Sequence, residues 1–286
     1  MVLGFGYSAG AFVRQVRPRN VVGTTRSVAR ADALHQRGIR SILMGDTPSP
    51  TLSQALRSAT HVLASAAPGA EGDPFLIDYE RDLAAAQHLE WIGYLSTIGV
   101  YGDHQGEVVD ERSLCVAMSE RNLRRIEAED AWFALGRRIR VPVGIFRLAG
   151  IYGPGRNTFV ALREGRARRI IKPGQVFNRI HVDDIGTTLA ASIARPAARV
   201  YNVCDDEPAP PQDVVTYAAG LMGVEPPPAL DFETADLTPM ARSFYSDVKR
   251  VSNARIRDEL GIELRYPTYR EGLGELWRSS TWDKDR

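Results

Sequence analysis

The fold is indicated most strongly by Met1-Val2-Leu3-Gly4-Phe5-Gly6-Tyr7-Ser8-Ala9-Gly10. Its three apolar residues predict a short strand, and the spacing G-x-G-x-x-A predicts a tight turn that opens a helix. Gly4 allows the turn, Gly6 lets the backbone approach a pyrophosphate, and Ala9 lets the helix pack on the strand. The N–H groups of Tyr7, Ser8 and Ala9 then face the phosphates at the positive end of the helix dipole. A turn that binds nothing fits the same pattern.

The second predicted strand, residues 20–26, indicates which dinucleotide the turn would hold. NAD-binding units place an acid about 20 residues past the glycines, on the ribose hydroxyls. This chain has Thr24, Thr25 and Arg26 there. Hydroxyls and a guanidinium would hold a 2′-phosphate that a carboxylate would repel. We therefore predict NADP(H) in preference to NAD(H). Since only three of the cations are lysines, a solvated arginine at a helix start is the alternative for Arg26.

The next two predicted strands, 39–46 and 60–68, end in further candidate cofactor contacts. Asp46 follows the first, where it would meet an adenine amino group or simply form a turn. Ser65 and Ala66 end the second, where small side chains allow a cofactor to pass closely but also suit a buried strand.

Strands and helices alternate along the whole chain, which predicts an α/β Rossmann-type, doubly wound, mostly parallel sheet. We expect residues 1–150 to form an NAD(P)-binding Rossmann domain. Residues 151–286 would supply the final Rossmann elements, interleaved with a small C-terminal substrate lobe. Ligands bind beyond the carboxyl ends of such strands.

The composition of the chain limits the classes of binding partner that we expect. A net charge of +1 indicates no nucleic acid and no anionic membrane surface. Two cysteines make neither a disulfide framework nor a metal site, and no spacing of His, Cys, Asp or Glu suggests a metal. There is no leader and no long apolar run, so a cytoplasmic location is expected. A homodimer through the predicted helices 75–88 and 119–136 stays open.

Four later motifs resemble one family. They are Leu95-Ser96-Thr97-Ile98-Gly99-Val100-Tyr101-Gly102, Arg147 with Tyr152–Gly155, Arg179-Ile180-His181-Val182-Asp183-Asp184, and Tyr201-Asn202-Val203. In this order they resemble the NAD-dependent epimerase/dehydratase branch of the short-chain dehydrogenase/reductase superfamily. The resemblance implies a dinucleotide, a substrate pocket between the lobes and a role for Thr97 as the catalytic Ser/Thr that holds a substrate oxygen. Arg179 and His181 are expected to be structural.

The family's Tyr-x-x-x-Lys pair is missing, so the chain resembles the atypical members. If Glu129 is aligned with the family's helix acid, Arg121 takes the Tyr place and Arg125 the Lys place. Arginine keeps its proton near neutral pH, so Arg121 cannot act as acid/base. Arg125 could still donate hydrogen bonds to a ribose.

Two functions follow. The favoured one is an NADP(H)-dependent oxidoreductase or epimerase/dehydratase-like enzyme that acts on a small polar molecule, with nucleotide-activated and phosphorylated substrates both left open. Its proton would come from Tyr101, His104 or water, although Tyr101 could equally be a packed ring. The alternative is a non-catalytic NADP(H)-binding redox sensor or regulatory protein.

Overall fold

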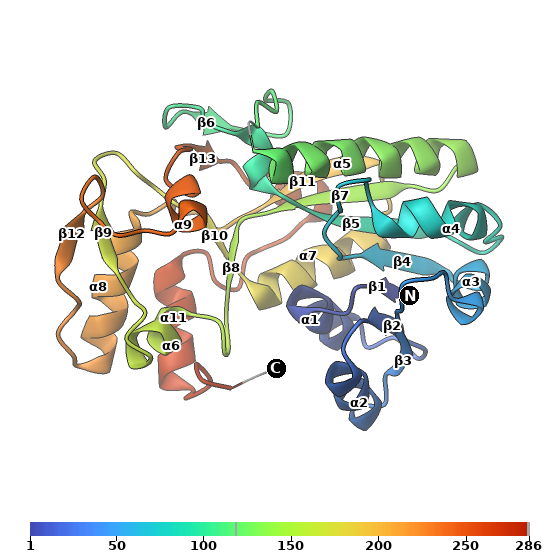
Figure 1. The fold of residues 1–286 in the computed structure, drawn as a ribbon, viewed down its shortest axis with the longest axis horizontal. Coiled ribbons are helices and arrows are strands. Elements are labelled where there is room, and N and C mark those ends of the chain that lie inside the picture. Colours follow the sequence, from blue (N-terminus) through green and yellow to red (C-terminus); the bar gives the residue numbers. More distant parts are fainter. Residues whose placement is uncertain (118, 285–286) are drawn as a thin grey trace. The chain divides into compact units, whose positions relative to one another are not determined.

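A seven-stranded sheet is the centre of the fold in the computed structural model, which describes residues 1–117 and 119–284 (Figure 1). From edge to edge its strands are β11 (Arg199–Val203), β7 (Val143–Leu148), β5 (Trp91–Thr97), β4 (His61–Ala64), β1 (Val2–Leu3), β2 (Val22–Thr25) and β3 (Arg40–Leu43). Strand β1 pairs in parallel with both β2 and β4. The order turns back on itself at β1, as in a doubly wound fold. The predicted fold class is confirmed.

Helices cover both faces of this sheet (Figure 1). On one face α3 (Pro50–Arg57), α4 (Pro74–Ala84) and α5 (Glu120–Ile139) bury a shared apolar core that includes Tyr79 and Trp132. On the other face lie α1 (Tyr7–Val16), α2 (Val28–Gln36) and α7 (Val182–Ala194). Helices α1 and α7 approach closely, because a Cβ at Gly186 would lie only 2.9 Å from the Ala11 carbonyl oxygen.

Helix α3 is an element that the sequence analysis does not anticipate. Ser49 caps it, with its hydroxyl accepting a hydrogen bond from the Leu52 N–H, and Pro50 stands in its first turn. A serine followed by proline is a common start signal for a helix, so local chemistry could have revealed this one. Serines also cap α2 and α5, where the side chains of Ser27 and Ser119 accept hydrogen bonds from the Arg30 and Asn122 N–H groups.

The chain divides into two compact units. Unit 1 comprises Met1–Val100, Met118–Arg147 and Ile185–Tyr201, and unit 2 comprises Tyr101–Ala117, Leu148–Asp184 and Asn202–Arg286. Residues 101–117 therefore belong to unit 2, whereas a single boundary at residue 150 would place them in the first domain. They follow the short 3₁₀ turn η1 (Ile98–Tyr101) that ends β5.

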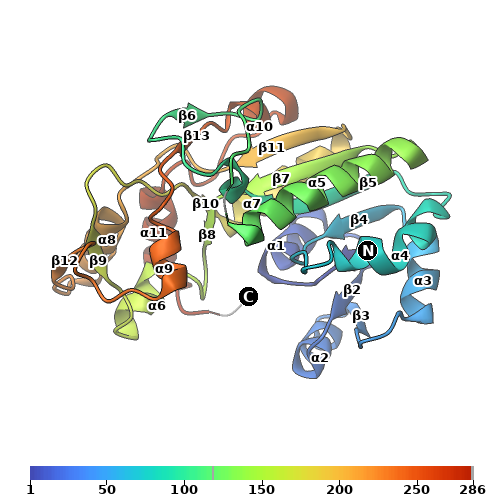
Figure 2. The same cartoon turned by 45° about the horizontal axis from the view of Figure 1, so that its top comes forward.

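Unit 2 is built from three small parallel strand pairs and five helices among the described residues (Figure 2). The pairs are β8 (Gly150–Tyr152) with β10 (Arg179–His181), β9 (Arg169–Ile171) with β12 (Ala229–Asp231), and β6 (Val108–Val109) with β13 (Arg250–Val251). The helices are α6 (Thr158–Arg163), α8 (Pro211–Met222), α9 (Pro239–Ser243), α10 (Ala254–Leu260) and α11 (Tyr269–Arg278). Helices α6, α8 and α11 share one apolar cluster.

Across the described residues, no helix combines the length and the apolar character needed to cross a bilayer.

Candidate functional site

The glycine turn after β1 is closed by Thr24 at the end of β2. Gly4 has φ +84°, a left-handed conformation that favours glycine, and its N–H donates to the Thr24 hydroxyl at 2.7 Å. The next N–H, that of Phe5, donates to the Thr24 carbonyl oxygen at 2.8 Å. A Cβ on Gly4 would lie 3.0 Å from the Ala66 backbone nitrogen. The turn is therefore fixed between the ends of two neighbouring strands.

Helix α1 starts from this turn with an open N-terminus. Gly6 is its N-cap, and no side chain of the described residues caps it. A Cβ at Gly6 would meet only the Gly4 carbonyl oxygen, at 3.9 Å, so a ligand can come close to the backbone. Tyr7, Ser8 and Ala9 form the first turn, where N–H groups are not used within the helix. These residues fit the phosphates of a dinucleotide.

The three candidate residues for the 2′-phosphate differ in their availability. Thr24 and Thr25 are 1% and 8% exposed, and each hydroxyl already accepts a backbone hydrogen bond, from Gly4 and Ser27 respectively. Arg26 is exposed, beside the N-terminus of α2. Arg26 is thus the group best placed for a phosphate, whereas the threonines shape the backbone. Their predicted binding roles remain predictions.

The remaining cofactor candidates of unit 1 lie after β3 and β4. Asp46 is exposed, three residues past the end of β3. The Ser65 N–H donates to the Leu3 carbonyl oxygen at 2.8 Å, which places Ser65 beside β1. Ala66 supplies the atoms that a side chain at Gly4 would strike. Ala66 therefore packs directly against the turn at Gly4.

Arg125 of α5 holds a positive charge at the carboxyl ends of β4 and β5. Its Nη1 donates to the Leu95 carbonyl oxygen at 2.8 Å, to the Tyr94 hydroxyl at 3.0 Å and to the Ala66 carbonyl oxygen at 3.4 Å. Burial raises the pKa of Tyr94 to about 12, so its hydroxyl stays neutral. These contacts fix the guanidinium at the sheet edge where ligands of Rossmann folds bind.

Glu129 anchors the same helix one turn further on. Its carboxylate accepts hydrogen bonds from Nε and Nη2 of Arg147 on β7, the shortest at 2.7 Å, and one from the Ser96 hydroxyl. The Glu129 and Arg147 side chains are only 4% and 8% exposed. This ion pair fixes the rotation of α5 about its axis, and so the direction in which Arg125 extends.

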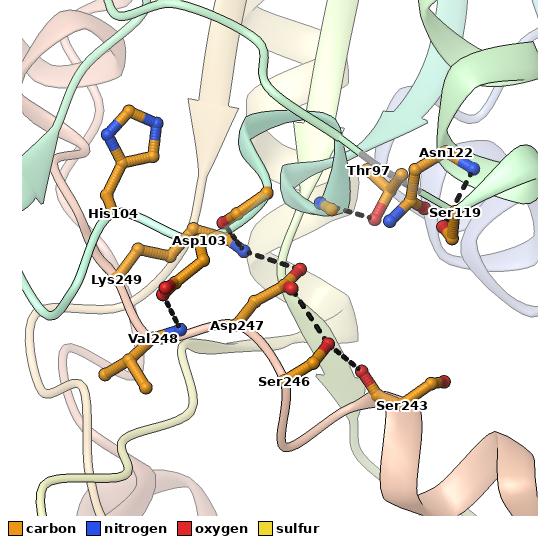
Figure 3. Close-up of polar contacts among 12 residues, drawn as sticks. Thr97, Asp103, His104, Ser119, Asn122, Ser243, Ser246, Asp247, Val248 and Lys249 are labelled. Carbon is orange, nitrogen blue, oxygen red and sulfur yellow. Dashed lines mark hydrogen bonds and ion pairs between the residues drawn. The ribbon is translucent and has the colours of Figure 1, made fainter.

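Thr97, the predicted catalytic hydroxyl, is the last residue of β5 (Figure 3). Its oxygen accepts a hydrogen bond from the Gly99 N–H at 3.1 Å, which leaves the hydroxyl proton for a ligand oxygen. The buried Asn122 amide packs on Gly99, where a Cβ would lie 2.8 Å from Nδ2. Asn122 is in the first turn of α5, capped by Ser119. Thr97 is therefore set in a rigid corner of unit 1.

Tyr101 and His104, the predicted proton carriers, belong to unit 2. Tyr101 is fully buried, and its hydroxyl donates to the Asn202 side-chain oxygen at 2.7 Å. His104 is half-buried, with Nε2 at 3.2 Å from the Leu114 carbonyl oxygen. Of the two interpretations of Tyr101, the burial favours the packed ring; its catalytic role is still a prediction.

Lys249 is a buried cation in the C-terminal part of the chain (Figure 3). Its Nζ donates to the Gly102 carbonyl oxygen at 2.6 Å and lies 3.4 Å from an Asp247 carboxylate oxygen. Burial lowers the pKa of Lys249. In the same segment the Val248 N–H donates to Asp103 at 2.8 Å. Together these bonds hold the loop after Tyr101 within unit 2, which gives Lys249 a structural role.

The fold and the glycine turn define a dinucleotide-binding Rossmann protein, and comparisons with known proteins agree. No family model matches the chain. Protein YeeZ of Escherichia coli K12 is 28% identical over 287 residues, covering 93% of this chain and 95% of YeeZ. A 3-diazoavenalumate denitrifying reductase of a Streptomyces species is 30% identical over 141 residues, which are 46% of this chain and 45% of the reductase.

Solved structures extend the match over nearly the whole chain. A functionally unknown conserved protein from Silicibacter pomeroyi has a TM-score of 0.88 and 48% identity, covering 98% of each chain. MoeE5 in complex with UDP-glucose and NAD has a TM-score of 0.75 and 26% identity, again with 98% of each covered. NAD-bound sugar-nucleotide epimerases and dehydratases of lower identity share the fold. The structures that the chain resembles thus include NAD-dependent epimerases and dehydratases, which matches the family resemblance of the sequence motifs.

Proposed function

We propose that this protein is an NADP(H)-dependent oxidoreductase or epimerase/dehydratase-like enzyme that acts on a small polar substrate. One observation carries the choice of cofactor: β2 ends without an acid. Its last two residues are threonines whose hydroxyls already accept hydrogen bonds, and the exposed Arg26 follows directly. A guanidinium at this place favours a 2′-phosphate.

The bound nicotinamide would supply or accept the hydride. The chain's own residues would bind and orient: the open end of α1 would hold the pyrophosphate, and Arg125 would donate to the ribose. The Thr97 hydroxyl would hold the reacting oxygen of the substrate. MoeE5, which binds UDP-glucose and NAD, supports a nucleotide-activated substrate, and the Streptomyces reductase supports a reduction.

An enzyme of this kind needs a source for the proton of the reaction, whereas a redox sensor does not. Arg121, at the place of the family's tyrosine, is exposed and cannot release a proton near neutral pH. We propose that water or a group of the substrate itself supplies the proton, with Thr97 positioning the oxygen. The redox-sensor alternative gains support if the protein binds NADPH tightly but none of the carbonyl substrates tested leads to oxidation of NADPH.

The test is a fluorescence titration with NADPH and with NADH, repeated for Arg26→Ala. We expect the wild-type protein to bind NADPH at least tenfold more tightly, since a charged hydrogen bond contributes about 1.5–3 kcal/mol. Arg26→Ala should remove that preference. Arg37→Ala, an exposed arginine at the other end of α2, is the matched control and should keep it. Equal affinities in the wild-type protein would reject the NADP(H) assignment.

A further inference from the structure

Unit 2 contains an arginine that the cofactor site does not use, Arg179 at the start of β10. Both of its side-chain hydrogen bonds to described residues leave from Nη1, to the carbonyl oxygens of Phe177 at 2.8 Å and Ala209 at 3.2 Å. The guanidinium carbon lies 6.0 Å from the centre of the Tyr269 ring. Burial lowers the pKa of Arg179, but an arginine stays charged at neutral pH.

The acid next to Arg179 does not neutralise it. The Asp205 N–H donates to the Arg179 carbonyl oxygen at 2.7 Å, yet no ion pair joins the two side chains among the described residues. Asp205 is 2% exposed, and burial raises its pKa to about 8. Its carboxyl group is therefore mostly protonated at pH 7 and is a hydrogen-bond donor.

Two buried polar atoms beside this cation have no hydrogen-bond partner among the described residues: Oδ2 of Asp205 and the Tyr269 hydroxyl. Tyr269 is 1% exposed. Buried polar groups are nearly always hydrogen-bonded, and a desolvated cation without a counterion is costly. A single anionic ligand would compensate the charge and offer acceptors to both groups.

We propose that Arg179, with Asp205 and Tyr269 beside it, binds a carboxylate or phosphate group of the enzyme's small-molecule substrate. The planar fork of Nε and Nη2 matches the two oxygens of such a group. The proposal rests on the proposed function only in identifying the ligand as the substrate. The existence of an anion site at Arg179 does not depend on that function.

The site should respond to pH through Asp205. The charged and titratable groups around it are Arg179 on β10, Tyr152 on β8, and Cys204, Asp206 and Glu207 in its own segment. Burial raises the pKa values of Tyr152 and Cys204 above their ordinary ranges, so both stay neutral. Ionised Asp205 would repel an anion and compete for the guanidinium. Anion affinity should therefore fall as pH rises past 8.

The experiment is an NMR titration of the full, nitrogen-labelled chain with inorganic phosphate and, separately, with benzoate at constant ionic strength. The Arg179 Nε–Hε signal, assigned by its loss in Arg179→Lys, should shift and saturate with at least one anion. The matched control is the signal of Arg166, an exposed arginine paired with Glu164, which should not saturate. Phosphate alone indicates a phosphorylated substrate, and benzoate alone indicates a carboxylic acid.

Two variants extend the titration. Arg179→Gln, checked for folding by circular dichroism, should lose anion binding yet keep the NADPH affinity of the wild-type protein. Between about pH 6 and pH 9 the wild-type affinity should fall roughly tenfold, and Asp205→Asn should flatten this profile. If neither anion shifts the Arg179 signal, or Arg166 responds equally, the site does not exist. If NADPH fails to bind but anions do, only the proposed function is overturned.

Discussion

Replacing Glu129 by glutamine should destabilise the protein strongly, because it removes the carboxylate that faces the buried Arg147. The two side chains are 4% and 8% exposed and share the hydrogen bonds from Nε and Nη2. Breaking a buried ion pair from one side costs about 3–5 kcal/mol, since the desolvated charge loses its partner. The new amide oxygen can still accept the hydrogen bond from the Ser96 hydroxyl. The substitution therefore tests mainly the effect of removing the negative charge. We expect a decrease of about 3–5 kcal/mol in the free energy of unfolding.

Urea denaturation followed by tryptophan fluorescence measures this loss, because Trp91 and Trp132 are buried in the same unit. The control is Glu127→Gln, an exposed acid on the same helix, which should change the free energy by less than about 0.5 kcal/mol. Adding Arg147→Met to Glu129→Gln also removes the buried cation and should restore at least about 1 kcal/mol.

This role of the ion pair would be contradicted if Glu129→Gln cost less than about 1 kcal/mol, or if the double variant were as unstable as the sum of the two single ones. The same samples report on function. Since Arg125 lies one turn before Glu129, NADPH affinity should fall in Glu129→Gln and stay unchanged in Glu127→Gln.

Three further outcomes are expected. Gly4→Ala should lose about 1–3 kcal/mol of stability and weaken NADPH binding, because φ of Gly4 is +84° and the added Cβ would lie 3.0 Å from the Ala66 nitrogen. Thermal unfolding and NADPH titration measure the two effects. Gly45→Ala is the control, since a Cβ at Gly45 meets no atom within 4 Å. Thr97→Val should keep NADPH affinity but abolish NADPH oxidation, and Thr97→Ser should restore it; retained turnover in the valine variant would reject the positioning role. Folding raises the pKa of Asp205 from 3.8 to about 8, so the folded protein holds a proton that the unfolded chain releases. Stability should therefore decrease as pH rises from about 4 to 8, by at most about 1.4 kcal/mol per unit, and urea titrations of Asp205→Asn should lack this slope.

Much of the fold could be predicted from local pattern. Periodicity and start signals predict the short strand before Gly4, the helices that begin near Ser27 and Ser119, and the alternation of strands and helices. The helix Pro50–Arg57 was missed although its serine-proline start is equally local. The placement of residues 101–117 in unit 2 could not be predicted, because β6 pairs with β13, which is far away in sequence.

The candidate site shows the same division. Residue type and spacing were enough to predict the glycine turn, the lack of an acid after it and the arginines in place of Tyr and Lys. The contacts of these side chains could be read only from the folded chain. It shows that the Thr24 hydroxyl closes the turn at Gly4, and that Tyr101 is buried against Asn202. It also brings Arg179 beside Asp205. Hydrogen-bond partners and burial depend on residues distant along the chain, and no local pattern encodes them.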